Sequence, residues 1–468
     1  MAHFLAPMDA MFLHLESPSM LAHVAGLQIF SLSGESSDDF LRQLVVEMRS
    51  TRDLAAPWNL KLKRSVLSRL LPSLATDRDV DMDYHVRHHA LPRPGGEREL
   101  GQLVSRLHSH RLNRRRPLWE CHVIEGLENH RFAIYTKIHH ALADGVTTMR
   151  LLTQSLAKAP ESRTSPFWAT APDKPSVAVA PAADIATAVR EQLRAIPNTL
   201  RAVGKVALSG LAGDPALTAP YVAPRSVLNV PIGGERRFAT HQCDIARLKA
   251  VGRAAEATLN DVVLALCGAA LRRFLKDANA LPGRPLVAGI PVSVRPANDV
   301  SGGNAVTMML AAIGTDIADP RLRLESIRNA TVRAKAHLHG MSSASIAQYS
   351  SVILAPFMTQ LLSGLSGHTR PYFSVSVSNV PGPKQPLYLQ GARLEAMYPV
   401  SNPFDGQALN ITCTSYINTL NFGFTGCRDS LPHMQHLAIY MGDALIELEA
   451  AYGLSGDETS PAGHVRAA

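Results

Sequence analysis

The sequence predicts two α/β domains with mixed sheets, joined by a linker. A chain of 468 residues is too long for one ordinary core, which favours two domains of roughly 150–230 residues. Strand-like and helix-like hydrophobic patterns alternate in both halves, and a segment rich in Pro, Ala, Ser and Thr separates them. We therefore expect domains at residues 1–160 and 233–468, a linker at 161–232, and an active site between the two domains.

The first half contains the patterns of a strand, two helices and a hairpin. In chain order we expect a strand at 24–30, helices at 38–48 and 97–112, and a hairpin with strands at 119–127 and 131–138. The hairpin turns at Glu128-Asn129-His130, and a histidine pair closes its second strand. Asp144 then stands where an N-cap residue belongs, so a further helix should begin directly after it.

The linker contains one amphipathic helical pattern, at residues 185–207. Its basic residues Arg190, Arg194, Arg201 and Lys205 lie off the apolar stripe. Such a helix can lie on an anionic membrane surface. It can equally be a crossover helix that packs on the domains with its charges in water, and both interpretations stay open.

The second half repeats the alternating style of the first. We expect strands at 237–243, 286–294, 305–313 and 372–377, a helix at 259–274, a hairpin with strands at 408–416 and 420–427, and a closing helix at 432–452.

The composition is that of a folded globular protein with an anionic partner. Apolar residues make up 46% of the chain and charged residues 18%, below the average of about 25%. The formal charge of +8 suits an acidic membrane face or a phosphate-bearing cosubstrate, whereas no nucleic-acid-binding pattern accompanies the basic residues. The five scattered cysteines and the absence of a signal-peptide pattern predict a cytoplasmic location. Residues 336–369 carry no charge, but their best apolar run, 352–358, is far shorter than the roughly 20 residues of a membrane span.

The segment His139-His140-Ala141-Leu142-Ala143-Asp144-Gly145 is the strongest candidate site. Successive side chains of a strand point to opposite faces, so only one of the two histidines can face a given cavity. An imidazole with a pKa near 6.5 can accept a proton at neutral pH and return it, as a general base must. Asp144 can hold the loop by capping the helix or by pairing with a cation, and Gly145 would let the helix start come close to the strand.

A second histidine pair tests how much the first one means. His88-His89-Ala90-Leu91 repeats the first four letters of the segment but continues into Pro92-Arg93-Pro94 without Asp-Gly, so we interpret it as structural or surface. The chain has no Gly-x-Ser-x-Gly nucleophile motif, and the histidines lack the spacing of known zinc ligands. We therefore expect no metal and no covalent acyl-enzyme.

Residues 139–145 resemble the signature of the CoA-dependent acyltransferase superfamily. This superfamily includes chloramphenicol acetyltransferase and the condensation domains of peptide synthetases. Other blocks narrow the resemblance to bacterial wax ester synthase/diacylglycerol acyltransferases. They lie in collinear order at 7–12, 117–120, 125–127, 260–264, 291–295 with 303–304, 378–383 and 409–412 with 415–416. One departure from the family pattern, at residues 402–408, leaves the preferred acceptor open.

The resemblance implies two chloramphenicol-acetyltransferase-like domains with an active-site tunnel between them that reaches His140 from both ends. Acyl-CoA, a cosubstrate and no permanently bound cofactor, would enter one side. A fatty alcohol or diacylglycerol would enter the other, giving wax ester or triacylglycerol by direct transfer. Family members associate peripherally with membranes or lipid inclusions, so we expect the same contact here.

Four further residues or groups each have two interpretations. Asn260 is a candidate polar group facing the site from the second domain, or else a helix N-cap. Arg295 is a candidate partner of Asp144, or else solvated. The cluster Arg114-Arg115-Arg116 can meet CoA phosphates or lipid headgroups, although a solvated basic face explains it as well. The turn at 378–383 can shape the tunnel wall or simply end a strand. The alternatives to a fatty acyltransferase are a condensation-domain-like acyltransferase and a catalytically inactive lipid-binding relative.

Overall fold

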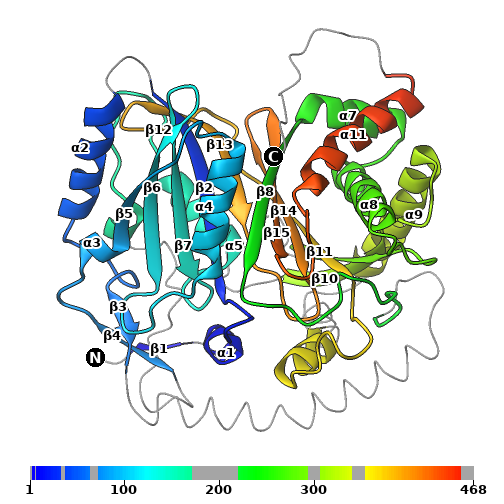
Figure 1. Ribbon diagram of the computed structural model, residues 1–468, viewed down its shortest axis with the longest axis horizontal. Coiled ribbons are helices and arrows are strands. Elements are labelled where there is room, and N and C mark those ends of the chain that lie inside the picture. The colour runs from blue at the N-terminus through cyan, green and yellow to red at the C-terminus, as the bar shows by residue number, and fades with distance from the viewer. Residues whose placement is uncertain are drawn as a thin grey trace.

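The computed structural model describes residues 3–5, 7–32, 37–63, 72–170, 220–293, 306–339 and 354–454. Two halves lie side by side, and each contains a six-stranded sheet covered by helices (Figure 1). This arrangement confirms the predicted mixed α/β fold class. The helical pattern at 185–207 lies outside the described residues.

The sheet of the N-terminal half has the strand order β12-β13-β2-β7-β6-β5. Its strands are β2 (His23–Ser31), β5 (Val86–Ala90), β6 (Trp119–Leu127), β7 (Arg131–His139), β12 (Tyr388–Leu389) and β13 (Ala392–Val400). Neighbouring strands are antiparallel except β5 and β6, which are parallel. The predicted hairpin is therefore β6–β7. Its turn uses Asn129 and His130 at φ values of 62° and 53°, a left-handed conformation that asparagine tolerates better than most residues.

Helices cover both faces of this sheet. Leu27 and Tyr135 pack with α4 (Glu97–Ser109) on one face. Phe30 and Phe132 pack on the other face with α2 (Ser37–Ser50) and α5 (Gly145–Gln154). The alternation of strand side chains thus divides the core into two layers.

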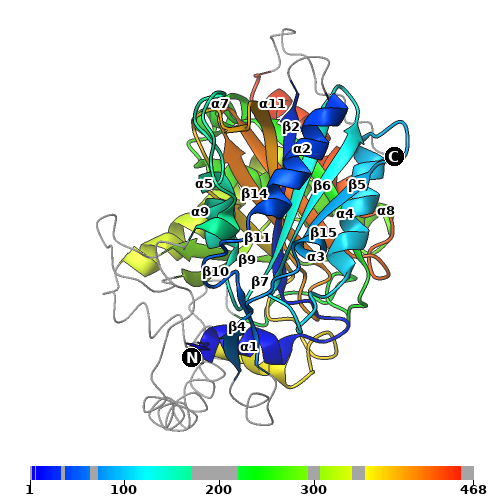
Figure 2. The ribbon, with the colours of Figure 1, turned by 90° about the vertical axis from the view of Figure 1, so that its left-hand side faces the viewer.

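Smaller elements complete the N-terminal half. They are α1 (Pro7–Leu15), α3 (Met82–His85), a short 3-10 helix (Phe167–Ala169), and a three-stranded sheet of β1 (His3–Phe4), β4 (Ser73–Thr76) and β3 (Leu60–Leu62). Two of them, α1 and β4, lie at the lower end of this half in Figure 2. None of these elements was expected from periodicity, because each is short and has little room to show a repeat.

The sheet of the C-terminal half has the order β10-β9-β11-β14-β15-β8. Its strands are β8 (Arg236–Asp244), β9 (Val287–Ser293), β10 (Val306–Ala312), β11 (Val375–Val380), β14 (Leu409–Tyr416) and β15 (Thr419–Cys427). β11 is parallel to both β9 and β14, whereas the other pairs are antiparallel. The six strands correspond to the expected ones, with ends shifted by a few residues.

Four helices flank this sheet and enclose a large apolar core with it: α7 (Ile245–Ala254), α8 (Leu259–Asp277), α9 (Pro320–His339) and α11 (His436–Ala451). α8 starts with a capping box, in which Thr258 and Asp261 satisfy each other's backbone N–H groups. The predicted helices at 259–274 and 432–452 are α8 and α11. α7 and α9 were not predicted.

β13 is the main surprise of the chain topology. It lies in the C-terminal part of the sequence but pairs with β2, so residues 392–400 complete the N-terminal sheet. Its alternation is interrupted by a bulge between Leu394 and Ala396 and by Pro399, which conceals the strand in the sequence. The division into domains at 1–160 and 233–468 remains a prediction. The strands β12 and β13 lie within residues 233–468 but pair with the sheet of the N-terminal half.

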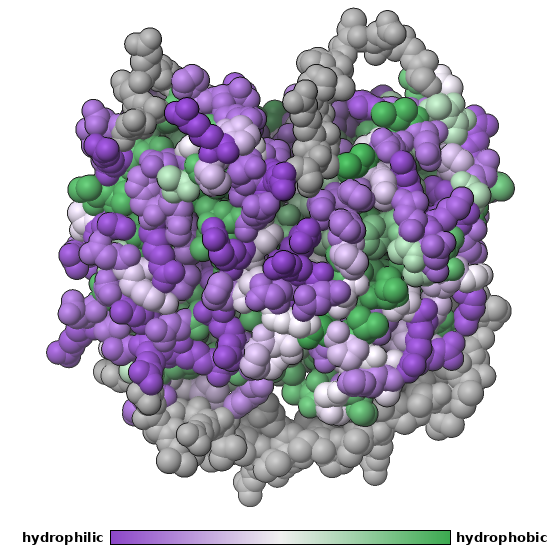
Figure 3. Space-filling view, viewed as in Figure 1, coloured by the Kyte–Doolittle hydropathy of each residue, from purple (hydrophilic) through white to green (hydrophobic). Residues whose placement is uncertain are grey.

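The two sheets approach each other closely where β13 meets β15. A Cβ atom placed on Gly423 would lie 2.0 Å from the carbonyl oxygen of Pro399, so only glycine fits there. The outer surface is mainly hydrophilic on the face drawn in Figure 3, with apolar residues scattered between polar ones. Among the described helices, no single one has the length and apolarity to cross a membrane. Only α7 and α8 taken together, across a 99° bend, satisfy those two criteria.

Candidate active site

The histidine motif begins where β7 ends. His139 is the last residue of the strand and lies opposite His23 of β2. The chain then leaves the sheet, with the His140 N–H donating to the Ala22 carbonyl over 2.9 Å and the Leu142 N–H donating back to the His139 carbonyl over 2.9 Å. This tight turn places the two histidine rings in different surroundings.

His139 is fully buried and already engaged in hydrogen bonding. Its Nδ1 accepts the backbone N–H of Ala141 over 3.0 Å, so the proton of the neutral ring is on Nε2. That nitrogen lies 3.8 Å from Oε1 of Glu16. Burial, followed by the charges of Arg114 and of His140, lowers the pKa of His139 to about 3. His139 is therefore held neutral and is unsuited to accept a substrate proton.

His140 is half-buried and lies outside the strand. Its ring stacks on Phe12 of α1, with the centroids 4.2 Å apart and the planes inclined by 12°. Burial lowers the pKa of His140, while the charge of Asp144 and a hydrogen bond with its own backbone partly oppose that shift. The imidazole is therefore neutral at neutral pH, which is the form that accepts a proton.

Asp144 is the N-cap of α5, as the sequence predicts. Its Oδ1 accepts the Thr147 N–H over 2.7 Å, and its carbonyl accepts the Thr148 N–H over 2.8 Å. The same carboxylate acts electrostatically on His140 and on Asp9 of α1. Burial and then the charge of Asp144 raise the pKa of Asp9 to about 6. Asp144 thus combines a structural and an electrostatic role.

The expected reason for Gly145 was wrong. A Cβ atom on this residue would meet no other atom within 4 Å, so close approach of helix and strand does not require glycine here. The first residue of α5 faces open space instead.

Asn260 and Arg295 have different outcomes. The N-cap of α8 is Thr258, so the capping alternative for Asn260 was wrong. The exposed Asn260 amide accepts a hydrogen bond from Nδ2 of Asn379, over 2.8 Å, and thereby connects α8 with the predicted turn at 378–383. Its place facing the site remains a prediction. Arg295 lies outside the described residues.

The arginine cluster is largely occupied by internal contacts. Arg114 binds Glu16, and Arg116 binds Asp81 at 2.7 Å while its guanidinium lies 4.1 Å above the Tyr84 ring. Two of the three arginines therefore form ion pairs within the N-terminal half, and whether the cluster is a solvated basic face or also meets CoA or lipid stays open.

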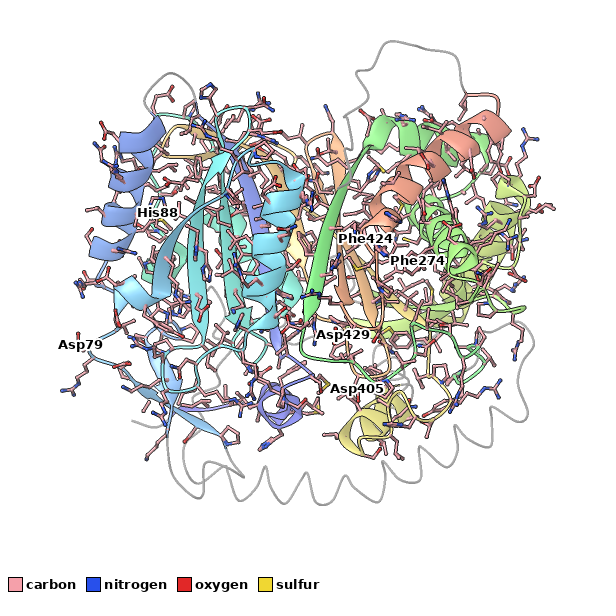
Figure 4. All side chains as sticks on the ribbon, viewed as in Figure 1. Asp79, His88, Phe274, Asp405, Phe424 and Asp429 are labelled. Carbon is pink, nitrogen blue, oxygen red and sulfur yellow. The ribbon has the colours of Figure 1, made fainter. Side chains whose placement is uncertain are left out.

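The second histidine pair is structural. His88 and His89 lie on β5, at the edge of the sheet away from the junction of the halves, as the label of His88 in Figure 4 shows. His88 pairs with Glu125 at 3.0 Å, and His89 lies 2.9 Å from His122. This confirms the interpretation drawn from the missing Asp-Gly.

The sequence interpretation missed Glu16, and it named Phe12 only within the block at 7–12 and Arg114 only as a candidate for CoA or lipid contact. Glu16 and Arg114 pair through Oε2 and Nε over 2.9 Å, next to His139. The block at residues 7–12, quoted for the family resemblance, was the available indication that α1 takes part in the site.

The segment at 402–408, which departs from the family pattern, fastens the junction of the two halves. Asn402 donates to the His23 carbonyl of β2 over 2.8 Å, while Asp405 accepts the Ile232 N–H over 3.0 Å within the C-terminal half. Within the described residues, no group of three or more His, Cys, Asp or Glu side chains is arranged to hold a metal ion.

Comparison with known proteins identifies the family of the chain. Residues 5–263 match the wax ester synthase/diacylglycerol acyltransferase catalytic domain, and residues 302–449 match the WS/DGAT C-terminal domain. A Mycobacterium tuberculosis protein, whose name carries a provisional diacylglycerol O-acyltransferase assignment, is 44% identical and aligned over 97% of this chain and 99% of its own.

Two solved structures extend the comparison. The wax ester synthase/diacylglycerol acyltransferase from Marinobacter aquaeolei VT8 is 38% identical, with a TM-score of 0.78 and coverage of 96% of this chain and 100% of that one. The first condensation domain of the CDA synthetase is 16% identical, with a TM-score of 0.57 over 97% of both chains, and shares the fold. These likenesses confirm the two-domain fold that the resemblance implied. The chain belongs to the wax ester synthase/diacylglycerol acyltransferase family and is an acyltransferase.

Proposed function

We propose that this acyltransferase moves a long-chain fatty acyl group from acyl-CoA to a fatty alcohol, to diacylglycerol, or to both, with His140 as the general base. One observation carries the assignment of the base. Of two adjacent histidines, His139 has Nδ1 occupied by the Ala141 N–H, whereas His140 lies half-buried beyond the strand with a neutral ring.

The reaction is a direct transfer within a ternary complex. His140 removes the proton from the acceptor hydroxyl as its oxygen attacks the thioester carbonyl of acyl-CoA. The tetrahedral intermediate then collapses, the carbon–sulfur bond breaks, and the leaving CoA thiolate takes the proton back from the imidazolium. The described cysteines are buried, and burial raises the pKa of Cys121, Cys243 and Cys267 to about 12, which makes them poor nucleophiles.

Asp144 would support the base in two ways. As N-cap it fixes the start of α5 directly after the motif, and its negative charge favours the imidazolium that forms during the reaction. Arg295 is proposed as the partner that balances this charge. Asn260 is proposed as a polar group of the second domain that faces the acyl-transfer site.

The substrates and the location follow from the same proposal. Acyl-CoA and the acceptor would reach His140 through a tunnel between the domains 1–160 and 233–468, joined by 161–232. Neither a metal nor a permanently bound cofactor takes part. The formal charge of +8 favours contact with an anionic membrane face or lipid inclusion from the cytoplasm, and nucleic acid is no partner.

The deciding experiment compares His140→Ala with His89→Ala. His89 occupies the same place in the repeated string His-His-Ala-Leu but lies on β5. We expect His140→Ala to lose roughly 10²- to 10⁴-fold in acyl transfer, the usual contribution of general-base catalysis, while His89→Ala keeps most activity. Free CoA thiol release is measured from palmitoyl-CoA with hexadecanol, with diacylglycerol and with neither acceptor.

Three outcomes would contradict the proposal. Near-normal activity of folded His140→Ala would exclude His140 as the base. No acceptor-dependent thiol release from the unaltered protein would favour an inactive lipid-binding relative. An acyl group covalently attached to the protein, detected by mass spectrometry of quenched reactions, would overturn direct transfer.

A further inference from the structure

α1 (Pro7–Leu15) brings an aromatic ring onto the face of the proposed catalytic base. The Phe12 and His140 rings are nearly parallel, at 12°, with centroids 4.2 Å apart. Both side chains are half-buried, so each of the two residues keeps part of its surface exposed to solvent. A ring contact of this kind fixes the plane of the imidazole and covers one of its faces.

Contacts at the carboxyl end of α1 fix the position of this helix. Glu16 follows the helix, and its N–H donates to the Phe12 carbonyl over 3.1 Å. Its carboxylate is 1% exposed and accepts Nε of Arg114 over 2.9 Å, while Arg114 Nη2 donates to the Leu13 carbonyl over 2.6 Å. A buried carboxylate needs such a partner, because an unpaired charge would be costly.

This ion pair therefore ties the carboxyl end of α1 to the segment that precedes β6. Glu16 also lies beside His139, whose backbone leads directly into His140. The carboxylate that fixes the end of α1 thus lies 3.8 Å from the ring of His139, the residue that directly precedes His140.

We propose that Phe12 is a positioning residue for His140: its ring, held in place by the Glu16–Arg114 pair, sets the plane of the imidazole and keeps water from one of its faces. This inference rests on the proposed role of His140 as the base.

Two measurable properties depend on this contact. A ring that is free to rotate spends less time aimed at the acceptor hydroxyl, so kcat should fall while KM changes little. Stacking of aromatic rings is worth about 0.5–1.5 kcal/mol, which corresponds to roughly 2- to 10-fold in rate.

Water admitted to the uncovered face would favour the charged imidazolium. Burial is the main cause of the lowered pKa of His140, so loss of the cover should raise that pKa toward its ordinary value. The acidic limb of the pH profile of kcat/KM reports the base in the free enzyme, and it should move to higher pH.

The test uses Phe12→Leu, Phe12→Tyr and a matched control, Phe40→Leu. Phe40 is a half-buried phenyl group on α2 that packs against Phe132, away from the motif. We expect Phe12→Leu to lower kcat roughly 2- to 10-fold and to shift the acidic limb upward. Phe12→Tyr keeps an aromatic ring and should therefore retain the kcat and the acidic limb of the unaltered enzyme. Phe40→Leu should change neither property.

A second variant keeps the inference testable if Phe12→Leu does not fold. Glu16→Gln retains the size of the side chain but removes the charge that binds Arg114. The Phe12 ring is still present in this variant, but it is no longer held in place. We therefore expect Glu16→Gln to lower kcat and to shift the acidic limb to higher pH, as Phe12→Leu does. Wild-type kcat and an unshifted limb in folded Phe12→Leu, or in Glu16→Gln where Phe12→Leu is unfolded, would overturn the inference.

Failure of this inference can be separated from failure of the proposed function. If His140→Ala is inactive while Phe12→Leu behaves like the unaltered enzyme, only the role of Phe12 is excluded. If His140→Ala remains active, the base assignment fails, whatever the Phe12 variants do.

Discussion

Glu120 on β6 is the centre of a buried polar chain that explains the second histidine pair. His89 donates from Nε2 to Nδ1 of His122 over 2.9 Å, and His122 then donates from Nε2 to Oε2 of Glu120 over 3.3 Å, an order that two neutral imidazoles satisfy. Lys137 lies 3.4 Å from the same carboxylate and donates to the Leu107 and His110 carbonyls at the end of α4. His89 therefore helps to stabilise the buried carboxylate of Glu120 through its hydrogen bond with His122.

This arrangement predicts how stability depends on acid. Burial alone would raise the pKa of Glu120, but the hydrogen bond from His122 and the charges of Lys137 and Arg87 outweigh it and lower the pKa to about 2. A carboxyl group whose pKa is lowered by folding stabilises the protein above its unfolded pKa of 4.5, and that stability is lost as the pH falls toward 2. Between about pH 5 and pH 3, Glu120 should account for a loss of about 2 kcal/mol.

Urea unfolding at several pH values tests this expectation. Glu120→Gln should remove that part of the acid dependence, whereas Asp83→Asn should not, because the Asp83 side chain is 81% exposed in its pair with Arg49. An equally steep fall in the free energy of unfolding for Glu120→Gln would show that other carboxylates are responsible.

The residues of the motif could be predicted from the sequence, whereas their surroundings could not. His139, His140 and Asp144 follow one another within a strand end and a helix cap, so local rules suffice to place them. Phe12 and Arg114 reach the motif only through the tertiary fold. Local patterns contain no information on which distant side chain will lie on the His140 ring.

At the scale of an element, α4 also has one feature that the sequence predicted and one that depends on the tertiary fold. The stripe of Leu100, Leu103, Val104 and Leu107 predicted its apolar face. A second face is formed by Ser105 and Ser109, whose Oγ atoms accept the Phe238 and Arg236 N–H groups of β8 over 2.9 Å and 2.8 Å. Since β8 is the last strand of its sheet, α4 covers an edge that would otherwise expose unpaired backbone groups.

Ser105→Ala should reveal what this edge contact contributes. Without the hydroxyl, the Phe238 N–H lacks its acceptor at the interface, which typically costs about 1–3 kcal/mol. Gln102→Ala is the matched control, because Gln102 is exposed on the same helix. Equal free energies of unfolding for the two variants would mean that water replaces the serine without loss.

At the scale of the whole molecule, the two halves hold each other through backbone pairing. β13 and the short strand β12 before it belong to the N-terminal sheet, where β13 pairs with β2, while β11 and β14 on either side of them belong to the C-terminal sheet. The sequence correctly predicted two α/β domains, each with a sheet covered by helices. It did not predict that β13 pairs with β2, because the pairing of a bulged strand with a partner at the other end of the sequence leaves no local pattern.

Cleavage of the chain between residues 171 and 219 tests this mutual dependence. After cleavage at a protease site inserted there, we expect both fragments to elute together in size-exclusion chromatography, because β13 and the α4–β8 contact still join them. Residues 1–170 expressed alone should aggregate, since β2 then has an open edge. Separate elution of two folded monomers would contradict the expectation.

The late position of β13 in the sequence also has a consequence for synthesis on the ribosome. β2 ends at Ser31, but its neighbour begins at Ala392, so most of the chain must be translated before that edge can close. At about 5–20 residues per second, the wait lasts roughly 20 to 70 s. During that time the nascent chain carries an open strand edge in a crowded cell, which makes it a client for the chaperones that meet emerging polypeptides.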